Sequence, residues 1–205
     1  MRLGVSVKKE ITEKKMEISK TIYLIERKDW RKWLARNHDK EKDIWLVYYR
    51  KSSGKPRISY NDAVEEAICY GWIDGIVKGI DEERFAQRFS PRRKKSNLSA
   101  INRERIADLI ENGKMTEFGM KAIEGLFDED YKMNFIIPQD ILYELQKDKQ
   151  TWEKFQGFSE RYKRIRIEYI EMMRNRNRKE FDKRLNYFAK MTRKNKQFGF
   201  VKEMV

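Results

Sequence analysis

The stretch Ala67–Arg103, AICYGWIDGIVKGIDEERFAQRFSPRRKKSNLSAINR, decides the predicted fold. Its segment 72–80 combines aromatic and β-branched residues with two glycines, which is typical of a strand that carries a bulge. Its segment 84–90 alternates side chains with a period of two, as a strand does. Only the acidic turn 81–83 separates the two segments, so the pattern predicts an antiparallel hairpin.

Two further strands are expected upstream of this hairpin. Segment 44–50, IWLVYYR, is the longest aromatic and β-branched run in the chain, and segment 21–25, TIYLI, is a shorter one. Together with the hairpin they predict a small antiparallel sheet of up to four strands.

Helices are expected around the sheet. Tryptophan and leucine recur at helical spacing in 27–37. Ser59 is a suitable N-cap for the next helix, and Gly71 is a suitable C-terminal residue for it. After the sheet, either Ser96 or Ser99 can cap a helix that runs to about residue 112.

The rest of the chain reads as helical from Pro138 onward. Its last helix, roughly 178–194, has two different faces. On one face, Phe181, Leu185 and Phe188 form an apolar stripe. The other face is a basic stripe of four lysines: Lys179, Lys183, Lys190 and Lys194.

The predicted fold class is therefore α+β, a small antiparallel sheet with packed helices followed by a helical C-terminal subdomain. We expect a mobile N-terminal arm at 1–17, an α+β core domain at 18–130, the helical subdomain at 131–196 and a tail at 197–205. A chain of 205 residues is long enough for this arrangement but short for two separate large domains.

The composition describes a folded and strongly basic protein. Hydrophobic residues make up 40% and charged residues 39%, with a net charge of +14 and a pI near 9.7. Such a surface attracts polyanions, namely nucleic acid or an anionic lipid surface, unless the basic residues are mainly matched by the 33 acidic ones in surface ion pairs. No apolar run is long enough to span a membrane and no signal peptide is visible, so a cytoplasmic location is expected.

The sequence contains few residues of the types that form catalytic or metal sites. The chain has one histidine, His38, and one cysteine, Cys69, which excludes zinc sites of the usual histidine and cysteine types. We expect His38 to be exposed in a polar turn and Cys69 to be a buried structural residue. The prediction is a protein without catalytic residues, metal or cofactor.

The best candidate site is the turn that leaves the second strand of the hairpin. Four consecutive cations come just before a helix, where free backbone N–H groups and the helix dipole also favour anions. The predicted anion-binding residues are Arg88, Arg92, Arg93, Lys94, Lys95, Ser96 and Asn97. The alternative is a solvated basic loop that is partly paired with the acidic turn 81–83.

A second candidate is a pocket at the motif Gly71-Trp72-Ile73-Asp74-Gly75. Trp72 and Asp74 are its predicted residues. We expect Asp74 to pair with a cation such as Arg88 or to accept backbone N–H groups in a turn, and we expect Trp72 to be buried together with Trp45, Ile68, Phe85 and Phe89.

Four motifs resemble a known family: Tyr60–Ala67 (YNDAVEEA), the Gly71–Gly75 motif, Gln87–Asn97 (QRFSPRRKKSN) and Gly113–Thr116 (GKMT). They are similar to the YdeI/OmpD-associated family, also called bacteriocin-protection proteins, and the resemblance covers roughly 21–194. Two departures are Leu98 in place of a usual tryptophan and a looser match in 173–184.

The resemblance and the basic turn together indicate a binding protein rather than an enzyme. The first hypothesis is recognition of a phosphate-bearing partner, with nucleic acid the leading case. The alternative, which the family name implies, is a protein-partner or stress-protection module without nucleic-acid contact.

Overall fold

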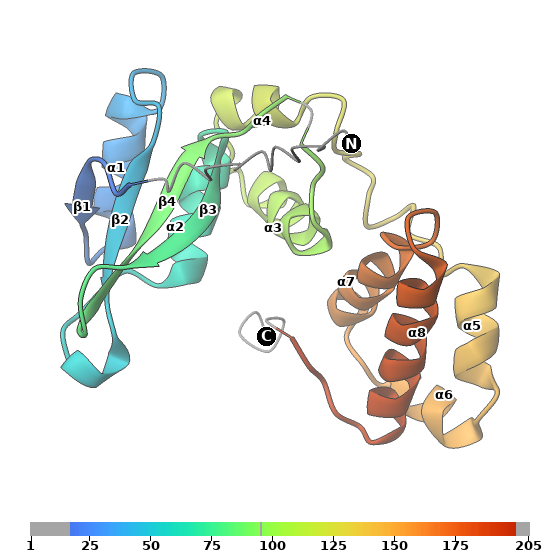
Figure 1. Cartoon of the computed structure of the whole chain (residues 1–205). Coiled ribbons are helices and arrows are strands. Elements are labelled where there is room, and N and C mark those ends of the chain that lie inside the picture. Colours follow the sequence, from blue (N-terminus) through green and yellow to red (C-terminus); the bar gives the residue numbers. More distant parts are fainter. Residues whose placement is uncertain (1–16, 95, 200–205) are drawn as a thin grey trace, which may run out of the picture.

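The computed structural model describes residues 17–94 and 96–199. Residues 1–16 of the expected arm, the candidate Lys95 and the end of the tail at 200–205 lie outside the described residues. The first part of the chain holds the sheet and four α-helices (Figure 1): β1 Thr21–Tyr23, α1 Arg27–Asn37, β2 Ile44–Tyr49, the 3₁₀-helix η1 Lys51–Ser53, α2 Tyr60–Cys69, β3 Trp72–Gly79, β4 Arg84–Pro91, α3 Ala100–Glu111 and α4 Glu117–Ile123. The second part is helical: α5 Gln139–Gln146, α6 Lys149–Gln156, α7 Glu160–Glu171 and α8 Arg178–Arg193. The α+β class is confirmed.

The sheet is mixed rather than purely antiparallel, with the order β1-β2-β4-β3. β2 and β3 both pair antiparallel with β4, as the predicted hairpin requires. β1, however, runs parallel to β2, with Thr21 opposite Trp45. The reason is that the chain crosses over through α1 before it re-enters the sheet, and a helical crossover returns the second strand in the direction of the first.

A β-bulge interrupts the pairing of β3 with β4. Asp74 lies opposite Phe89, but the next pair along the strands is Val77 with Gln87, so β3 has one extra residue. Cross-strand partners share a face of the sheet. The bulge therefore directs both Asp74 and Val77 to the face that carries Phe89 and Gln87.

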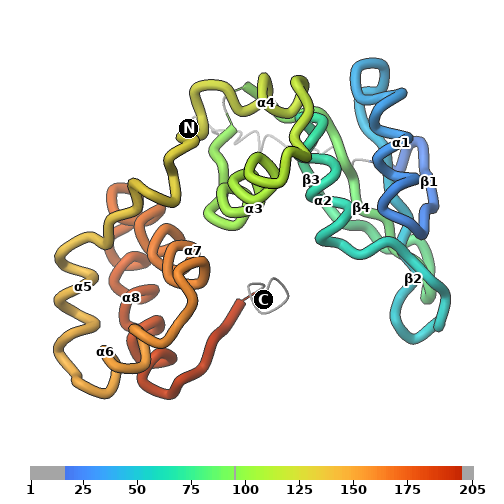
Figure 2. The backbone as a smooth tube through the Cα atoms, turned by 180° about the vertical axis from the view of Figure 1, so that it is seen from behind, coloured from blue at the N-terminus to red at the C-terminus, as the bar shows by residue number. Residues whose placement is uncertain are grey.

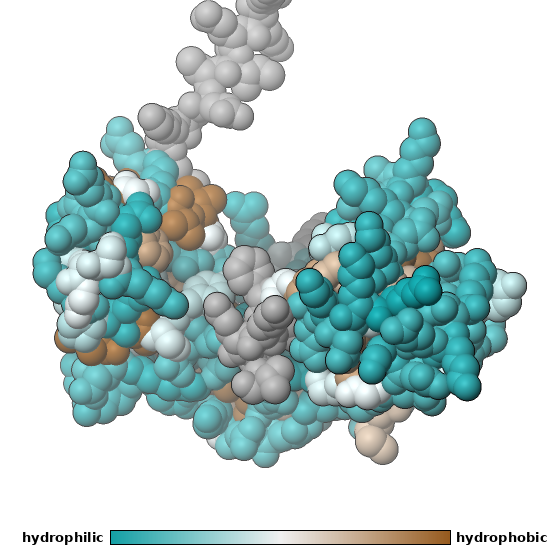
Figure 3. Space-filling view, turned by 90° about the horizontal axis from the view of Figure 1, so that it is seen from below, coloured by the Kyte–Doolittle hydropathy of each residue, from teal (hydrophilic) through white to brown (hydrophobic). Residues whose placement is uncertain are grey.

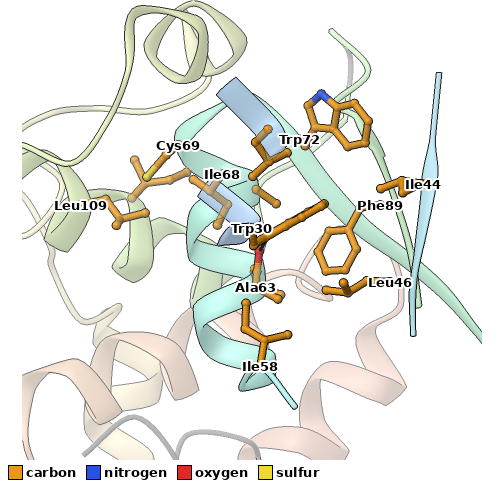
Figure 4. Packing of buried hydrophobic residues seen from close by; sticks show 14 of the residues in the cluster. Trp30, Ile44, Leu46, Ile58, Ala63, Ile68, Cys69, Trp72, Phe89 and Leu109 are labelled. Carbon is orange, nitrogen blue, oxygen red and sulfur yellow. Dashed lines mark hydrogen bonds between the residues drawn. The ribbon is translucent and has the colours of Figure 1, made fainter. Parts of the chain in front are cut away.

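Helices α1 and α2 cover this face and form the first hydrophobic core with it. Figure 4 shows Trp30 between Ala63 of α2 and Phe89 of β4; its indole Nε1 donates to the Ala63 carbonyl at 2.9 Å. On the opposite face, Trp45 packs with Val47 and Ala86 in a small separate cluster.

Burial agrees with most of the predicted core. Trp45, Ile68, Trp72 and Phe89 are each at most 5% exposed, whereas Phe85 is only partly buried.

The second core is formed mainly by α5–α8, together with Ala100 at the start of α3. The buried residues of this core include the predicted apolar stripe of α8, Phe181, Leu185 and Phe188. Figure 2 shows the yellow segment 124–138 leading from α4 to this helical group. α3 packs against α7 and so connects the two parts.

Serine and threonine side chains define several helix starts, as the sequence suggested. Ser59 caps α2, Ser99 caps α3 and Thr116 caps α4, each accepting a backbone N–H three residues on. Of the two serines considered for α3, Ser99 is the one that begins the helix.

Candidate anion-binding site

The basic turn lies between the end of β4 at Pro91 and the start of α3 at Ala100. Ser96 and Asn97 precede the Ser99 cap, so they lie in the turn and not in the first turn of the helix. The expectation that their amides form a helix N-terminus is therefore wrong. Ser96 instead bonds back to Arg93, with its hydroxyl donating to the Arg93 carbonyl at 2.8 Å.

Arg92 holds the turn in shape. Its Nη2 donates to the carbonyls of Ser96 at 3.0 Å and Asn97 at 2.8 Å. Burial, with a smaller effect of Arg103, lowers the pKa of Arg92, but a guanidinium remains charged at neutral pH. Its Nε is buried and has no partner among the described residues.

Arg92 and Lys94 also line a surface pocket of about 430 Å³, which we call the basic hollow. A third cation, Lys121, comes from α4. None of these three cations has an ion-pair partner in the part of the chain that the structure describes. One carboxylate, Glu124, is part of the lining. The remaining lining residues are His38, Tyr70, Gly71, Trp72, Pro91, Phe118, Ala122 and Leu126.

His38 is half-buried in this hollow and not exposed as expected. Its Nδ1 lies 3.0 Å from the Leu34 carbonyl, which only accepts, so Nδ1 carries a proton. Its ring lies 4.1 Å from the ring of Phe118, between centroids. Nε2 is buried without a partner among the described residues. Packing of α4 against the end of α1 is what buries the ring.

Trp72 is a core residue that borders the hollow. It is 2% exposed, and its Nε1 donates to the His38 carbonyl at 3.0 Å. Gly71, which precedes it, has φ +74° and would place a Cβ only 2.8 Å from the Cβ of Ala122. A glycine is needed there because the backbone is left-handed and α4 approaches closely.

Asp74 lies in a different pocket from Trp72, so the structure does not bring the two predicted pocket residues together. Its Oδ2 accepts from the Tyr60 hydroxyl at 2.9 Å and from Gln87 Nε2 at 3.1 Å. The expected pairing of Asp74 with Arg88 or with turn amides is wrong, because the bulge turns Asp74 toward α2.

Arg88 is separate from the basic turn. It lies on the opposite face of β4, where Nε and Nη2 donate to Asp43 Oδ2 at 3.1 and 2.7 Å. Burial alone would raise the pKa of Asp43, but hydrogen bonds from Arg88 and Ser19 outweigh it and lower that pKa. Arg88 thus has a carboxylate partner within the fold.

The lysine stripe lies on the solvent face of α8. Its four side chains are exposed, and Lys183 has a loose contact of 3.8 Å with Glu180. None of the four lines the basic hollow. The two basic surfaces predicted from the sequence are therefore distinct.

Cys69 is fully buried, and burial raises the pKa of its thiol to about 11, so it is a protonated structural residue at neutral pH. Over 17–94 and 96–199 there is no group of three or more histidine, cysteine, aspartate or glutamate residues that could hold a metal ion. Nor does any helix in these ranges have the length and apolar character needed to cross a membrane.

Sequence reasoning missed Lys121, Phe118 and the position of His38 in the hollow. These residues come from α4 and from the end of α1, far along the chain from the basic turn. A pattern of local residues carries no signal of their approach.

Comparison with known families divides the chain in two. Residues 22–122 match the model of a domain of unknown function (DUF8412). Residues 134–195 match the family described as bacteriocin-protection, YdeI or OmpD-associated. The resemblance to that family is confirmed for residues 134–195, whereas the motifs that indicated it, from Tyr60 to Thr116, all lie within the segment that matches the domain of unknown function. No curated protein and no solved structure matches the chain.

Proposed function

Since residues 134–195 match the bacteriocin-protection, YdeI or OmpD-associated family, we propose that this protein is a binding protein for a phosphate-bearing partner, with nucleic acid as the first candidate. The partner binds at the basic hollow through Arg92, Lys94 and Lys121, with Arg93 beside it. We also propose that the chain consists of two domains, an α+β domain at 18–130 and a helical domain at 131–196.

The observation that supports the proposal is the set of unpaired cations around one hollow. Arg92, Lys94 and Lys121 face a concave surface of about 430 Å³ without an ion-pair partner in the described ranges. Elsewhere the fold pairs many of its arginines with carboxylates, as Arg88 with Asp43. Cations left without partners at a concave site favour a multiply charged anion.

The charge of the whole chain supports the same partner. A net charge of +14 attracts a polyanion over long range and raises its association rate. Figure 3 shows that hydrophilic residues cover most of one face of both parts of the molecule. The lysine stripe of α8 is a secondary contact surface in this proposal.

A duplex-binding titration tests the proposal. Fluorescence anisotropy of a labelled duplex DNA is measured against the wild type and the double variant Lys94→Ala/Lys121→Ala at several salt concentrations. Each phosphate contact contributes a slope near −0.9 in log affinity against log salt, so removing two cations flattens the slope by up to about two units. We do not replace Arg92, because its bonds to the turn would confound the result.

A matched control has the same charge change elsewhere. Lys149 and Lys154 lie on α6, and Lys149 is 91% exposed in its side chain. Lys149→Ala/Lys154→Ala is expected to leave the slope unchanged. Equal slopes for all three proteins, or no binding by the wild type, would contradict nucleic-acid recognition at the hollow.

The second candidate function is a contact with a protein, in line with the family description. The specific observation is that Met133 and Ile136, in the segment between α4 and α5, are 86% and 82% exposed. Large apolar side chains that exposed favour a protein contact. This alternative gains weight if the wild type shows no salt-dependent binding of DNA or RNA.

A further inference from the structure

A second pocket, of about 470 Å³, opens beside Asp74 on the helix-covered face of the sheet. Its residues come from three strands, from α2 and α3, and from the loop before α2, so they are separate in sequence. They are Tyr48, Arg57, Tyr60, Asp74, Gly75, Val77, Phe85, Gln87, Ile101 and Arg105. The volume lies in the range of pockets that hold small organic molecules.

Arg105 is the decisive residue. It is 5% exposed, yet no carboxylate lies within ion-pair distance of it in the described part of the chain. Its Nη1 and Nη2 donate to the side-chain oxygens of Asn102 at 3.0 Å and Asn61 at 2.7 Å, and its Nε has no partner in the described ranges. A buried cation with only neutral partners is costly, and an anionic ligand would compensate its charge.

Tyr48 is a second unpartnered group of the same pocket. It is 2% exposed, and its hydroxyl has no hydrogen-bond partner among the described residues. Burial raises the pKa of Tyr48, so the hydroxyl is protonated and can donate. A buried hydroxyl without a partner costs free energy unless a ligand completes it.

The other walls select the type of anion. Arg57 lies over the rings of Tyr48 and Phe85, which are themselves stacked at 5.2 Å, and Val77 and Ile101 add apolar surface. The lining of the pocket carries one net positive charge, from the guanidinium groups of Arg57 and Arg105 and the carboxylate of Asp74. A singly charged carboxylate with a flat apolar body matches these walls better than a phosphate does.

We propose that this pocket binds a small organic monocarboxylate with a flat apolar body. The carboxylate accepts from Arg105 and Tyr48, and the apolar body lies against Phe85, Val77 and Ile101. Tyr60 and Gln87 both donate to Oδ2 of Asp74, and these three residues form one wall of the pocket. Oδ1 of Asp74 has no partner among the described contacts and can accept a hydrogen bond from a polar group on the ligand. The site is separate from the basic hollow and does not depend on the proposed function.

Isothermal titration calorimetry and saturation-transfer NMR test the proposal with benzoate, 4-hydroxybenzoate and indole-3-acetate as probes. Benzamide and indole-3-acetamide are the neutral controls. We expect saturable binding of at least one acid and at least tenfold weaker binding of its amide, because the amide has no charge to offer Arg105.

Tyr48→Phe is the sharpest variant, because the hydroxyl makes no hydrogen bond within the described fold. It is expected to weaken binding of the acid by roughly tenfold while the thermal midpoint stays equal or rises. Arg57→Met is expected to weaken it as well, and Lys94→Ala/Lys121→Ala to leave it unchanged. Failure of all three acids to bind, equal binding of acid and amide, or unchanged affinity in Tyr48→Phe would overturn the proposal.

Discussion

Arg164 of α7 donates two hydrogen bonds to the carboxylate of Glu104 of α3, from Nε to Oε1 at 2.5 Å and from Nη2 to Oε2 at 3.0 Å. The side chains are 11% and 1% exposed. Hydrogen bonding to Glu104 outweighs burial and raises the pKa of Arg164. This pair joins the segment that matches the domain of unknown function to the segment that matches the bacteriocin-protection family.

We expect Arg164→Met to lower the free energy of unfolding by about 3–5 kcal/mol, because it leaves the buried carboxylate of Glu104 without its bidentate partner. Urea denaturation measures the change. Arg84→Met is the matched control, since Arg84 and Asp81 are about 40% exposed and a solvent-exposed ion pair contributes little to stability. Equal losses in the two variants would mean that the pair does not hold the parts together.

Replacing Trp72 with Ala is expected to cost about 3–5 kcal/mol, the usual range for a buried large aromatic side chain. The indole also loses its bond to the His38 carbonyl and its edge contact with Trp33, at 5.8 Å between ring centroids. Trp72→Phe keeps a ring and should lose less. If the thermal midpoint of Trp72→Ala equals that of the wild type, Trp72 is not a core residue.

Replacement by alanine is expected to have opposite effects on stability at Gly119 and at Gly79. A Cβ on Gly119 would lie 2.4 Å from the backbone oxygen of Cys69, where α4 begins against the end of α2. Because a backbone group cannot move aside as a side chain does, Gly119→Ala is expected to destabilise by at least roughly 1–3 kcal/mol. At Gly79 no heavy atom lies within 4 Å, so Gly79→Ala should be neutral or stabilise by about 0.4–1 kcal/mol. Thermal unfolding of both variants checks the pair, and a stable Gly119→Ala protein would contradict it.

We expect the buried thiol of Cys69 to make the free energy of unfolding fall at alkaline pH. Burial raises the pKa of its thiol from 9.0 to about 11 in the folded protein. Between these values the unfolded state binds fewer protons than the folded state, so the free energy of unfolding falls as pH rises. The stabilising contribution is fully present below about pH 9, and two pKa units correspond to about 2–3 kcal/mol.

Urea denaturation at pH 8 and pH 11 measures this contribution when wild type is compared with Cys69→Ala. The wild type should lose about 2–3 kcal/mol more between the two pH values than the variant does. Alkaline effects of other groups occur in both proteins and cancel in the comparison. Parallel losses would show that the thiol is not protected by burial.

Most of the elements were predictable because their signals are local. The aromatic and β-branched run Ile44–Tyr49 formed β2, and Ser59 and Thr116 capped helices where their side chains reach the backbone three residues on. The alternation predicted for 84–90 is present in the structure, where Gln87 and Arg88 lie on opposite faces of β4. The presence of a basic turn was equally evident.

The candidate sites were predictable only in part. Lys94 and Arg92 were identified, but the role of Arg92 in holding the turn and the contribution of Lys121 were not. Arg88 was grouped with its neighbours in sequence, whereas its partner is Asp43. Charge patterns show where cations are and not which carboxylate the fold brings to them.

Local patterns of residues were sufficient to predict the fold class, the hairpin, the core residues Trp72 and Phe89 and the basic character of the turn, because backbone propensity, capping and hydrophobic period depend on residues close in the chain. The parallel pairing of β1 with β2 and the bulge that turns Asp74 toward Tyr60 became evident from the folded structure alone. The folded structure also shows that Arg105 and Tyr48 meet at one pocket without partners in the described fold. These relationships depend on how segments far apart in the chain pack together, and no local pattern carries that information.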